Sequence, residues 1–206
     1  MNGILFTQDN HLAIRELIKD LTRREEACLK EINQEPDNWF LSGKTEDGSS
    51  FGFWHQGRDE QRTVKSRYKV GQTYYIKEAW CEDSGDLYYR LDWAASLPVA
   101  MVADGLKWHS PLFLPERFAR DFILMTDVSI GRLQDITEED AVREGMRPQP
   151  FNSCDLCRAR VCSRHQPALG QYHHIWDSIN GQGEWDKNPW VIRYCFKLVR
   201  KDGKEV

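Results

Sequence analysis

The sequence predicts an α+β fold that is mainly β, with short flanking helices and loop insertions. Two β-rich runs carry this prediction, residues 122–130 and residues 190–199. In the second run, polar Arg193 and Lys197 stand among large apolar side chains, which is typical of a half-buried strand. The helical patterns between such runs are few and short, so strands should form most of the framework.

Length and composition favour one domain with insertions. A chain of 206 residues is short for two full domains, and periodicity is weak near residues 25–67, 94–116 and 147–170. No apolar run approaches the roughly 20 residues of a membrane span. The N-terminus shows no basic region followed by a hydrophobic block. We therefore expect a cytoplasmic protein that does not enter the membrane and keeps its thiols reduced.

The net charge is −4, so the chain is not a polycation that binds nucleic acid without selectivity. The positive residues nevertheless gather in three clusters: Arg15, Lys19, Arg23 and Arg24; Arg58, Arg62, Lys65, Arg67 and Lys69; and Arg158, Arg160, Arg164 and His165. Local basic patches can bind phosphate. For each cluster taken alone, ordinary solvated charge is the better interpretation. The aromatic residues could stack on bases, although most should be core.

The N-terminal segment predicts a short strand at residues 4–6 followed by a long helix. Ala13, Leu17 and Leu21 recur every four residues, which is a helical apolar stripe. A helix through this stripe would place Lys19 and Thr22 on one face. From spacing alone, however, a solvated lysine and threonine are the better interpretation of these two residues.

The middle of the chain predicts strands joined by tight turns. Residues 51–54 should form part of a hairpin after the Asp47-Gly48 turn signal. A further strand is expected to open at residue 70 and to run to Trp80, and another covers residues 88–91 after the turn at Ser84-Gly85.

A capping box predicts the start of a short helix near residue 137. Thr137 is followed three residues later by Asp140, and Gly145 can end the helix in a left-handed conformation. Glu144 then lies in the last turn, where a carboxylate opposes the helix dipole at a cost of about 0.3–1 kcal/mol. An unfavourable position of this kind hints at a functional carboxylate.

Four residues in the last insertion have the spacing of a zinc site. Cys154, Cys157, Cys162 and His165 follow a C-x2-C-x4-C-x2-H pattern. Three thiolates and one imidazole complete a tetrahedral zinc ion with no open position, which predicts a structural rather than a catalytic metal. The alternative is four reduced side chains on a loop.

Several motifs together carry a resemblance to a known family. They are Ile4-Leu5-Phe6, residues 19–24 (KDLTRR), residues 71–80 (GQTYYIKEAW), residues 89–92 (YRLD), residues 126–145, and the closing block at residues 176–191. In this order they resemble ASCH-domain proteins, in the long form common in phages and prophages. The resemblance implies a PUA-like fold, a small antiparallel β-barrel with helices over its openings. It also implies the cytoplasm of a bacterial or phage-infected host.

The same resemblance implies RNA or nucleotide-like ligands in a cleft beside the first helix. Compact bacterial members are amidohydrolases that remove the acetyl group from N4-acetylcytidine with a Lys, a Thr and a Glu. Their positions correspond to Lys19, Thr22 and Glu144 here, and a further basic residue corresponds to Arg24. This chain departs from the family motif before and after the lysine, where it has Leu17, Ile18 and Asp20.

These observations predict an RNA- or modified-nucleoside-binding protein with a polar cleft. Its predicted lining is Lys19, Thr22, Arg24, Glu78 and Glu144, with Tyr75 or Trp80 as stacking surfaces. One alternative is an enzyme that hydrolyses N4-acetylcytidine or a related substrate with Lys19, Thr22 and Glu144 as catalytic residues. Another is a phage accessory protein that acts through protein partners.

Overall fold

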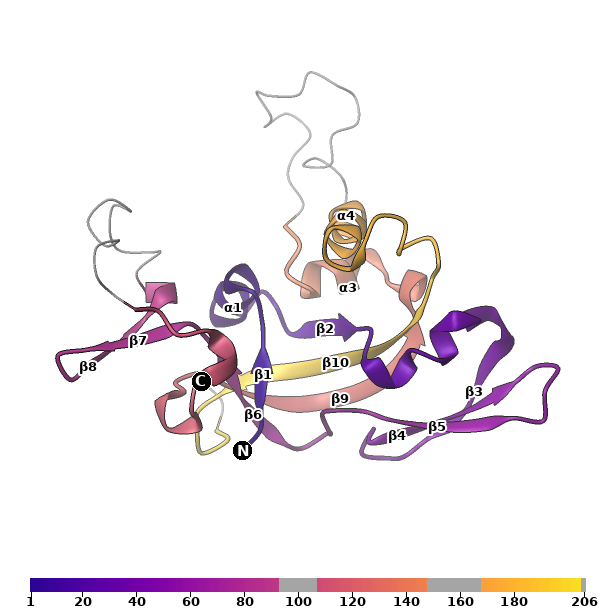
Figure 1. The fold of residues 1–206 in the computed structure, drawn as a ribbon, viewed down its shortest axis with the longest axis horizontal. Helices are drawn as coiled ribbons and strands as arrows, with labels where there is room; N and C mark the ends of the chain where they lie inside the picture. The colour runs from indigo at the N-terminus through magenta and orange to yellow at the C-terminus, as the bar shows by residue number, and fades with distance from the viewer. Residues whose placement is uncertain (93–106, 148–167, 205–206) are drawn as a thin grey trace, which may run out of the picture. The chain divides into compact units, whose positions relative to one another are not determined.

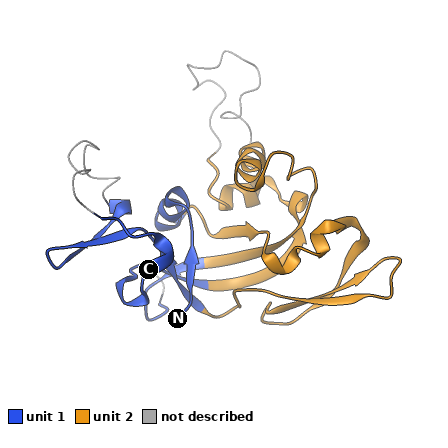
Figure 2. Cartoon of the chain, viewed as in Figure 1, with its two compact units in different colours: residues 1–17, 73–124, 197–206 blue, residues 18–72, 125–196 orange. Residues whose placement is uncertain are grey.

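A computed structural model describes residues 1–92, 107–147 and 168–204 (Figure 1). The chain divides into two compact units (Figure 2). Unit 1 comprises residues 1–17, 73–124 and 197–206, and unit 2 comprises residues 18–72 and 125–196. Two long strands, β9 (Phe122–Arg132) and β10 (Trp190–Val199), each have residues in both units. Strand β9 covers the predicted β-rich run at residues 122–130, and β10 covers the one at residues 190–199.

The largest sheet has five strands in the order β1-β6-β9-β10-β2. Strand β1 (Gly3–Leu5) is parallel to β6 (Thr73–Lys77), and β6 is antiparallel to β9. At the other end of the strand order, β2 (Leu21–Arg24) is antiparallel to β10. The order begins and ends on different strands, so the described strands form an open sheet and not the closed barrel that the family resemblance implies. The α+β, strand-rich architecture itself is as predicted.

The described part of unit 1 includes helix α1 (Gln8–Arg15), a hairpin, and residues 90–92, which are also helical. Helix α1 begins where the Thr7 hydroxyl accepts a hydrogen bond from the Asn10 backbone N–H, at 3.3 Å. The hairpin pairs β7 (Trp80–Asp83) with β8 (Asp86–Tyr89) around the predicted turn at Ser84-Gly85. Among the described residues of this unit, 3-10 segments span Pro111–Phe113 and Glu116–Phe118.

The prediction of one helix through Leu21 is wrong. Helix α1 ends at Arg15, and Leu17 adopts a left-handed conformation (φ 58°) with its side chain 71% exposed. Leu21 instead pairs with Cys195 in the antiparallel ladder between β2 and β10. The four-residue spacing of apolar side chains is therefore shared between a short helix and a strand, and tertiary pairing overrides the local helical pattern. Lys19 lies between the two elements and Thr22 lies on the strand.

Unit 2 contains a second sheet within the first predicted insertion. Its order is β3 (Trp39–Lys44), β4 (Ser50–His55) and β5 (Gln61–Lys65), all antiparallel. This sheet confirms the hairpin predicted at residues 51–54. Three 3-10 segments precede it, at Ala27–Leu29, Ile32–Gln34 and Pro36–Asn38.

Two helices of unit 2 share a hydrophobic core. Helix α3 (Glu138–Arg143) follows a 3-10 turn at Leu133–Asp135, and α4 (Ala168–Asn180) comes after the undescribed residues. Their core is formed by Leu133, Ile136, Ala141, Met146, Ala168, Tyr172, Trp176 and Val191. As predicted, Thr137 caps α3 by accepting from the Asp140 N–H, and Gly145 (φ 96°) ends it.

Several residues singled out in the sequence lie outside the described ranges. The zinc ligands proposed at Cys154, Cys157, Cys162 and His165 lie there, as does most of the insertion near residues 94–116. Across the described ranges, no helix combines the length and the apolar character that crossing a membrane requires.

Candidate functional site: two buried polar clusters

A first polar cluster, the Lys19 cluster, gathers Lys19, Arg23, Asp140, Glu144 and Tyr172 in unit 2. The link before β2 is fixed to the end of α3 by Asp20. The Asp20 N–H donates to the Arg143 carbonyl at 3.1 Å, and its carboxylate accepts from the Arg143 guanidinium at 2.8 and 3.1 Å. This double attachment places Lys19 beside the C-terminal end of the helix.

Lys19 and Glu144 form a buried ion pair. The Lys19 Nζ donates to the Glu144 backbone carbonyl at 2.6 Å and to Glu144 Oε2 at 2.9 Å, and each residue is only 3% exposed. A cation at a helix C-terminus is favourable. Lys19 therefore offsets the unfavourable position of the Glu144 carboxylate.

The guanidinium of Arg23 extends the cluster. Its Nη1 donates to Glu144 Oε1 at 3.4 Å, and its Nη2 donates to Asp140. Arg193, which lies opposite Arg23 in the β2–β10 ladder, donates to the other Asp140 oxygen at 3.2 Å. Two cations from the sheet thus hold two carboxylates of α3.

Tyr172 brings a hydroxyl from α4 to the Glu144 carboxylate. Burial, and after it the negative charge of Glu144, raises the pKa of Tyr172 well above its ordinary value. The phenol therefore stays protonated at neutral pH and donates its hydrogen bond.

Lys19 is also shifted electrostatically. Burial lowers the pKa of its amine below the ordinary 10.5, while the charge and hydrogen bond of Glu144 act in the opposite direction. Arg24 lowers the pKa further and Asp20 raises it. A lysine with a lowered pKa gives up its proton more readily, as a general base must.

Two other predicted residues lie on β2. Thr22 is 7% exposed and pairs with Tyr194, and Arg24 stands two residues further along the same strand. Among the described residues, the Thr22 hydroxyl makes no hydrogen bond to the Lys19 amine or the Glu144 carboxylate. The structure therefore brings Lys19 and Glu144 into contact, and it leaves Thr22 outside their hydrogen bonds.

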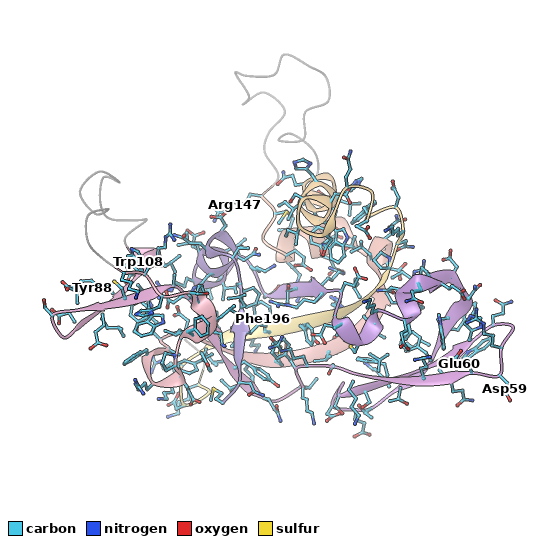
Figure 3. All side chains as sticks on the ribbon, viewed as in Figure 1. Asp59, Glu60, Tyr88, Trp108, Arg147 and Phe196 are labelled. Carbon is cyan, nitrogen blue, oxygen red and sulfur yellow. The ribbon has the colours of Figure 1, made fainter. Side chains whose placement is uncertain are left out.

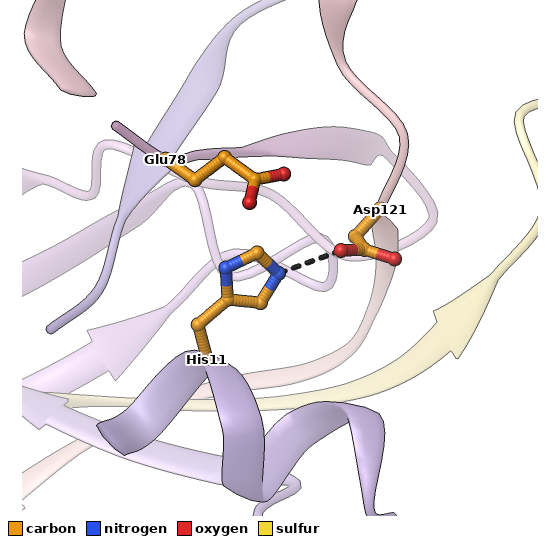
Figure 4. Close-up of side chains that lie close together, drawn as sticks. All are labelled: His11, Glu78 and Asp121. Carbon is orange, nitrogen blue, oxygen red and sulfur yellow. Dashed lines mark hydrogen bonds and ion pairs between the residues drawn. The ribbon is translucent and has the colours of Figure 1, made fainter. Parts of the chain in front are cut away.

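A second polar cluster, the His11 cluster, lies in unit 1. The His11 Nε2 is 2.7 Å from Asp121 Oδ2 (Figure 4). The same carboxylate oxygen also accepts from the Arg15 Nε at 2.7 Å. Glu78 binds the Arg120 guanidinium through both carboxylate oxygens, each at 2.7 Å. Burial by itself raises the pKa of Asp121, but the hydrogen bonds from His11 and Arg15 outweigh it and lower that pKa.

Three members of the His11 cluster could hold a metal ion. One donor atom each from His11, Glu78 and Asp121 lies within 4.8 Å of the others. One imidazole and two carboxylates are an ordinary ligand set for a divalent cation. In the arrangement seen here, Arg120 and Arg15 already neutralise the two carboxylates, so a cation would compete with them.

The three remaining predicted ligand-binding residues also belong to unit 1. Glu78 is the carboxylate bound by Arg120. Tyr75 is buried in a core cluster with Phe122 and Val199, and its hydroxyl donates to the Leu114 carbonyl at 3.3 Å. Trp80 stacks on His109, with ring centroids 4.5 Å apart.

Several members of the two clusters were not predicted from the sequence. Arg23, Asp140 and Tyr172 belong to the first, and His11 and Asp121 belong to the second. His11 and Arg15 stand four residues apart, a spacing that places both on one helical face. That spacing was an available signal, whereas the positions of Tyr172 and Asp121 depend on tertiary packing.

Comparison with protein-family models, with curated proteins and with solved structures finds no match to this chain. The ASCH-domain assignment therefore stays a prediction from the motifs.

Proposed function

We propose that the Lys19 cluster binds an RNA base or a modified nucleoside of the cytidine type. The buried pair of Lys19 and Glu144, from positions 125 residues apart, is the observation that carries the proposal. Burying two opposite charges costs several kcal/mol for each ion and is weak evidence for a purely stabilising role. A role in ligand binding explains why this costly pair is buried.

The hydrogen-bonding capacity of Glu144 suits a cytosine. A carboxylate has about four acceptor positions, and Lys19, Arg23 and Tyr172 use three of them. The remaining position could accept from the N4–H of cytosine, which carboxylates recognise elsewhere. Hydrogen bonds formed in so buried a place are strengthened by the low local dielectric.

The ASCH-like, PUA-like assignment belongs to the same proposal. It is supported by the order of the motifs and by the contact between the two residues that the resemblance pairs. The described strands form an open five-stranded sheet. A PUA-like arrangement therefore requires a barrel that these strands leave incomplete.

Hydrolysis of an N4-acetyl group is the second candidate function, and the lowered pKa of Lys19 favours it. Lys19 would accept the Thr22 hydroxyl proton as the Thr22 oxygen attacks the acetyl carbonyl. The carbon–nitrogen bond would then break, with a proton returned to the leaving amine by Lys19 or Glu144. Water would finally hydrolyse the acetyl-threonine ester. Arg24 would stabilise the oxyanion.

One experiment tests both functions. The protein is incubated with N4-acetylcytidine, and bound nucleoside and released cytidine are both measured. Binding without release supports the binding protein. Release that is lost in Thr22→Val, a change of similar shape that removes the hydroxyl, and in Lys19→Ala supports the hydrolase.

Lys187→Ala serves as the control, because Lys187 is an exposed lysine of unit 2 that pairs with Glu184 at the surface. Absence of both binding and release would contradict the nucleoside proposal. A stable protein partner recovered under those conditions would instead support the accessory-protein alternative.

A further inference from the structure

The β3–β5 sheet presents one face to solvent. Phe51, Phe53 and His55 of β4 are buried, so the alternate residues Ser50, Gly52 and Trp54 point to the opposite side. The strand register adds their cross-strand neighbours to this surface, which we call the β3–β5 face. Its outward residues are Phe40, Ser50, Gly52, Trp54, Gln61, Thr63 and Lys65.

An exposed aromatic pair occupies one end of the β3–β5 face. Phe40 and Trp54 lie opposite each other in the ladder, with ring centroids 4.9 Å apart and ring planes at 21°. They remain 39% and 42% exposed. Exposed rings on a sheet are surfaces on which unpaired bases stack.

The middle of the face carries only small side chains. Gly52 lies opposite Gly43 on one side and Thr63 on the other, and the Ser42 hydroxyl lies over Gly52, 2.7 Å from where a Cβ atom would stand. Beyond the glycines, Lys65 stands opposite Ser50. The distance from Trp54 to this row is four residues, or roughly 13 Å at ~3.3 Å per residue.

The charge of the three strands suits a polyanion. None of them contains Asp or Glu, although the chain as a whole has a net charge of −4. Their cations are Lys44, Arg62 and Lys65. Arg62 is paired with Glu31 and Glu60, whereas no described acidic residue forms an ion pair with Lys44 or Lys65. Glu60 itself lies in the turn between β4 and β5 (Figure 3).

We propose that the β3–β5 face binds single-stranded RNA. A base stacks on the Phe40–Trp54 pair, and the backbone crosses the row of small residues around Gly52 so that a phosphate reaches Lys65. Gln61 and Thr63 offer hydrogen bonds to 2′-hydroxyl groups, which distinguish RNA from DNA. A protein partner fits less well, because the apolar area is two rings within a polar surround, and stable protein interfaces need a larger patch.

This inference goes beyond the nucleoside proposal and does not depend on the Lys19 cluster. The test is fluorescence anisotropy with a labelled single-stranded RNA of mixed sequence at low salt. Trp54→Ala should weaken binding by roughly 5- to 150-fold. Phe113→Ala, which removes an aromatic ring that is 73% exposed in unit 1, should leave binding unchanged. Lys65→Gln should reduce the slope of log affinity against log salt by about 0.7.

Equal affinities of the Trp54→Ala and Phe113→Ala variants would overturn the proposal, as would a wild-type protein that does not bind. Equal affinity for DNA of the same sequence would overturn the assignment to RNA. A dimer in sedimentation that Trp54→Ala abolishes, without RNA binding, would make the face a protein interface instead. Measuring N4-acetylcytidine binding by Trp54→Ala separates the two sites, because that variant should keep the nucleoside.

Discussion

Lys19 is a buried cation whose surroundings come from three elements. The end of α3 supplies a carbonyl and a carboxylate, β2 supplies Arg23 beside the same carboxylate, and α4 supplies the Tyr172 hydroxyl. Removing one member of a buried pair leaves the other charge uncompensated. The cluster therefore matters for stability whether or not it binds a ligand.

Replacing Lys19 with methionine should lower the free energy of unfolding by about 3–5 kcal/mol. The change keeps the length of the side chain and leaves the Glu144 carboxylate without its closest cation. Urea unfolding measures the effect, and Lys187→Met is the matched surface control. The double variant Lys19→Met, Glu144→Leu should recover much of the loss. Full stability of the single variant would show that the pair is not buried as described.

The lowered pKa of Lys19 predicts a pH dependence with a definite sign. Below its folded-state pKa, the native protein bears the full cost of a buried charge. As the pH rises from that pKa toward 10.5, the unfolded state binds more protons at this site, so the stability of the wild type rises relative to Lys19→Met. Unfolding across this range measures the difference. A difference that falls with pH would mean that Glu144 dominates and the pKa is raised.

At the scale of elements, the sequence predicted the helices and strands whose ends are marked by capping or turn residues. Thr137 and Gly145 bound α3 because one side chain caps and one backbone turns left, and both features are visible in the sequence. The long alternating run of β10 is equally local. The N-terminal apolar stripe gave a wrong prediction. Leu21 has the spacing of a helical residue, but it pairs with β10 as part of a strand, and that pairing depends on a distant segment.

The cap of α3 should have a measurable effect. Thr137→Ala removes the acceptor of the Asp140 N–H and should cost about 0.5–2 kcal/mol of stability. Thermal or urea unfolding measures it. Ser178→Ala in α4, where the hydroxyl bonds the Ile175 carbonyl within an exposed helical turn, should change stability by less than about 0.5 kcal/mol. Equal effects of the two changes would show that the Thr137 cap does not contribute measurably to stability.

At the scale of the whole molecule, the sequence could propose that Lys19 and Glu144 meet only through family resemblance. No local pattern joins residues 125 positions apart. The contact between His11 and Asp121 could not be predicted for the same reason, since the two residues lie 110 positions apart. The open end of the five-stranded sheet is likewise a property of long-range strand order, which composition and periodicity do not determine.

Metal content separates the two candidate metal positions. If the cysteine-rich insertion binds structural zinc, about one ion per chain should remain after dialysis. Cys157→Ser should lose it, and His11→Ala should retain it. Elemental analysis of the three proteins measures this. Zinc that is lost in His11→Ala and kept in Cys157→Ser would move the metal to the His11 cluster.

The most direct measurement is calorimetric titration of N4-acetylcytidine into wild-type protein and into Glu144→Gln, with thermal unfolding of both as a check on folding. The proposal predicts saturable binding by the wild type and at least tenfold weaker binding by the variant, about 1.4 kcal/mol, because the carboxylate that accepts from the base is gone. A folded variant that binds as tightly as the wild type, or a wild type that does not bind, would contradict the proposed role of the Lys19 cluster.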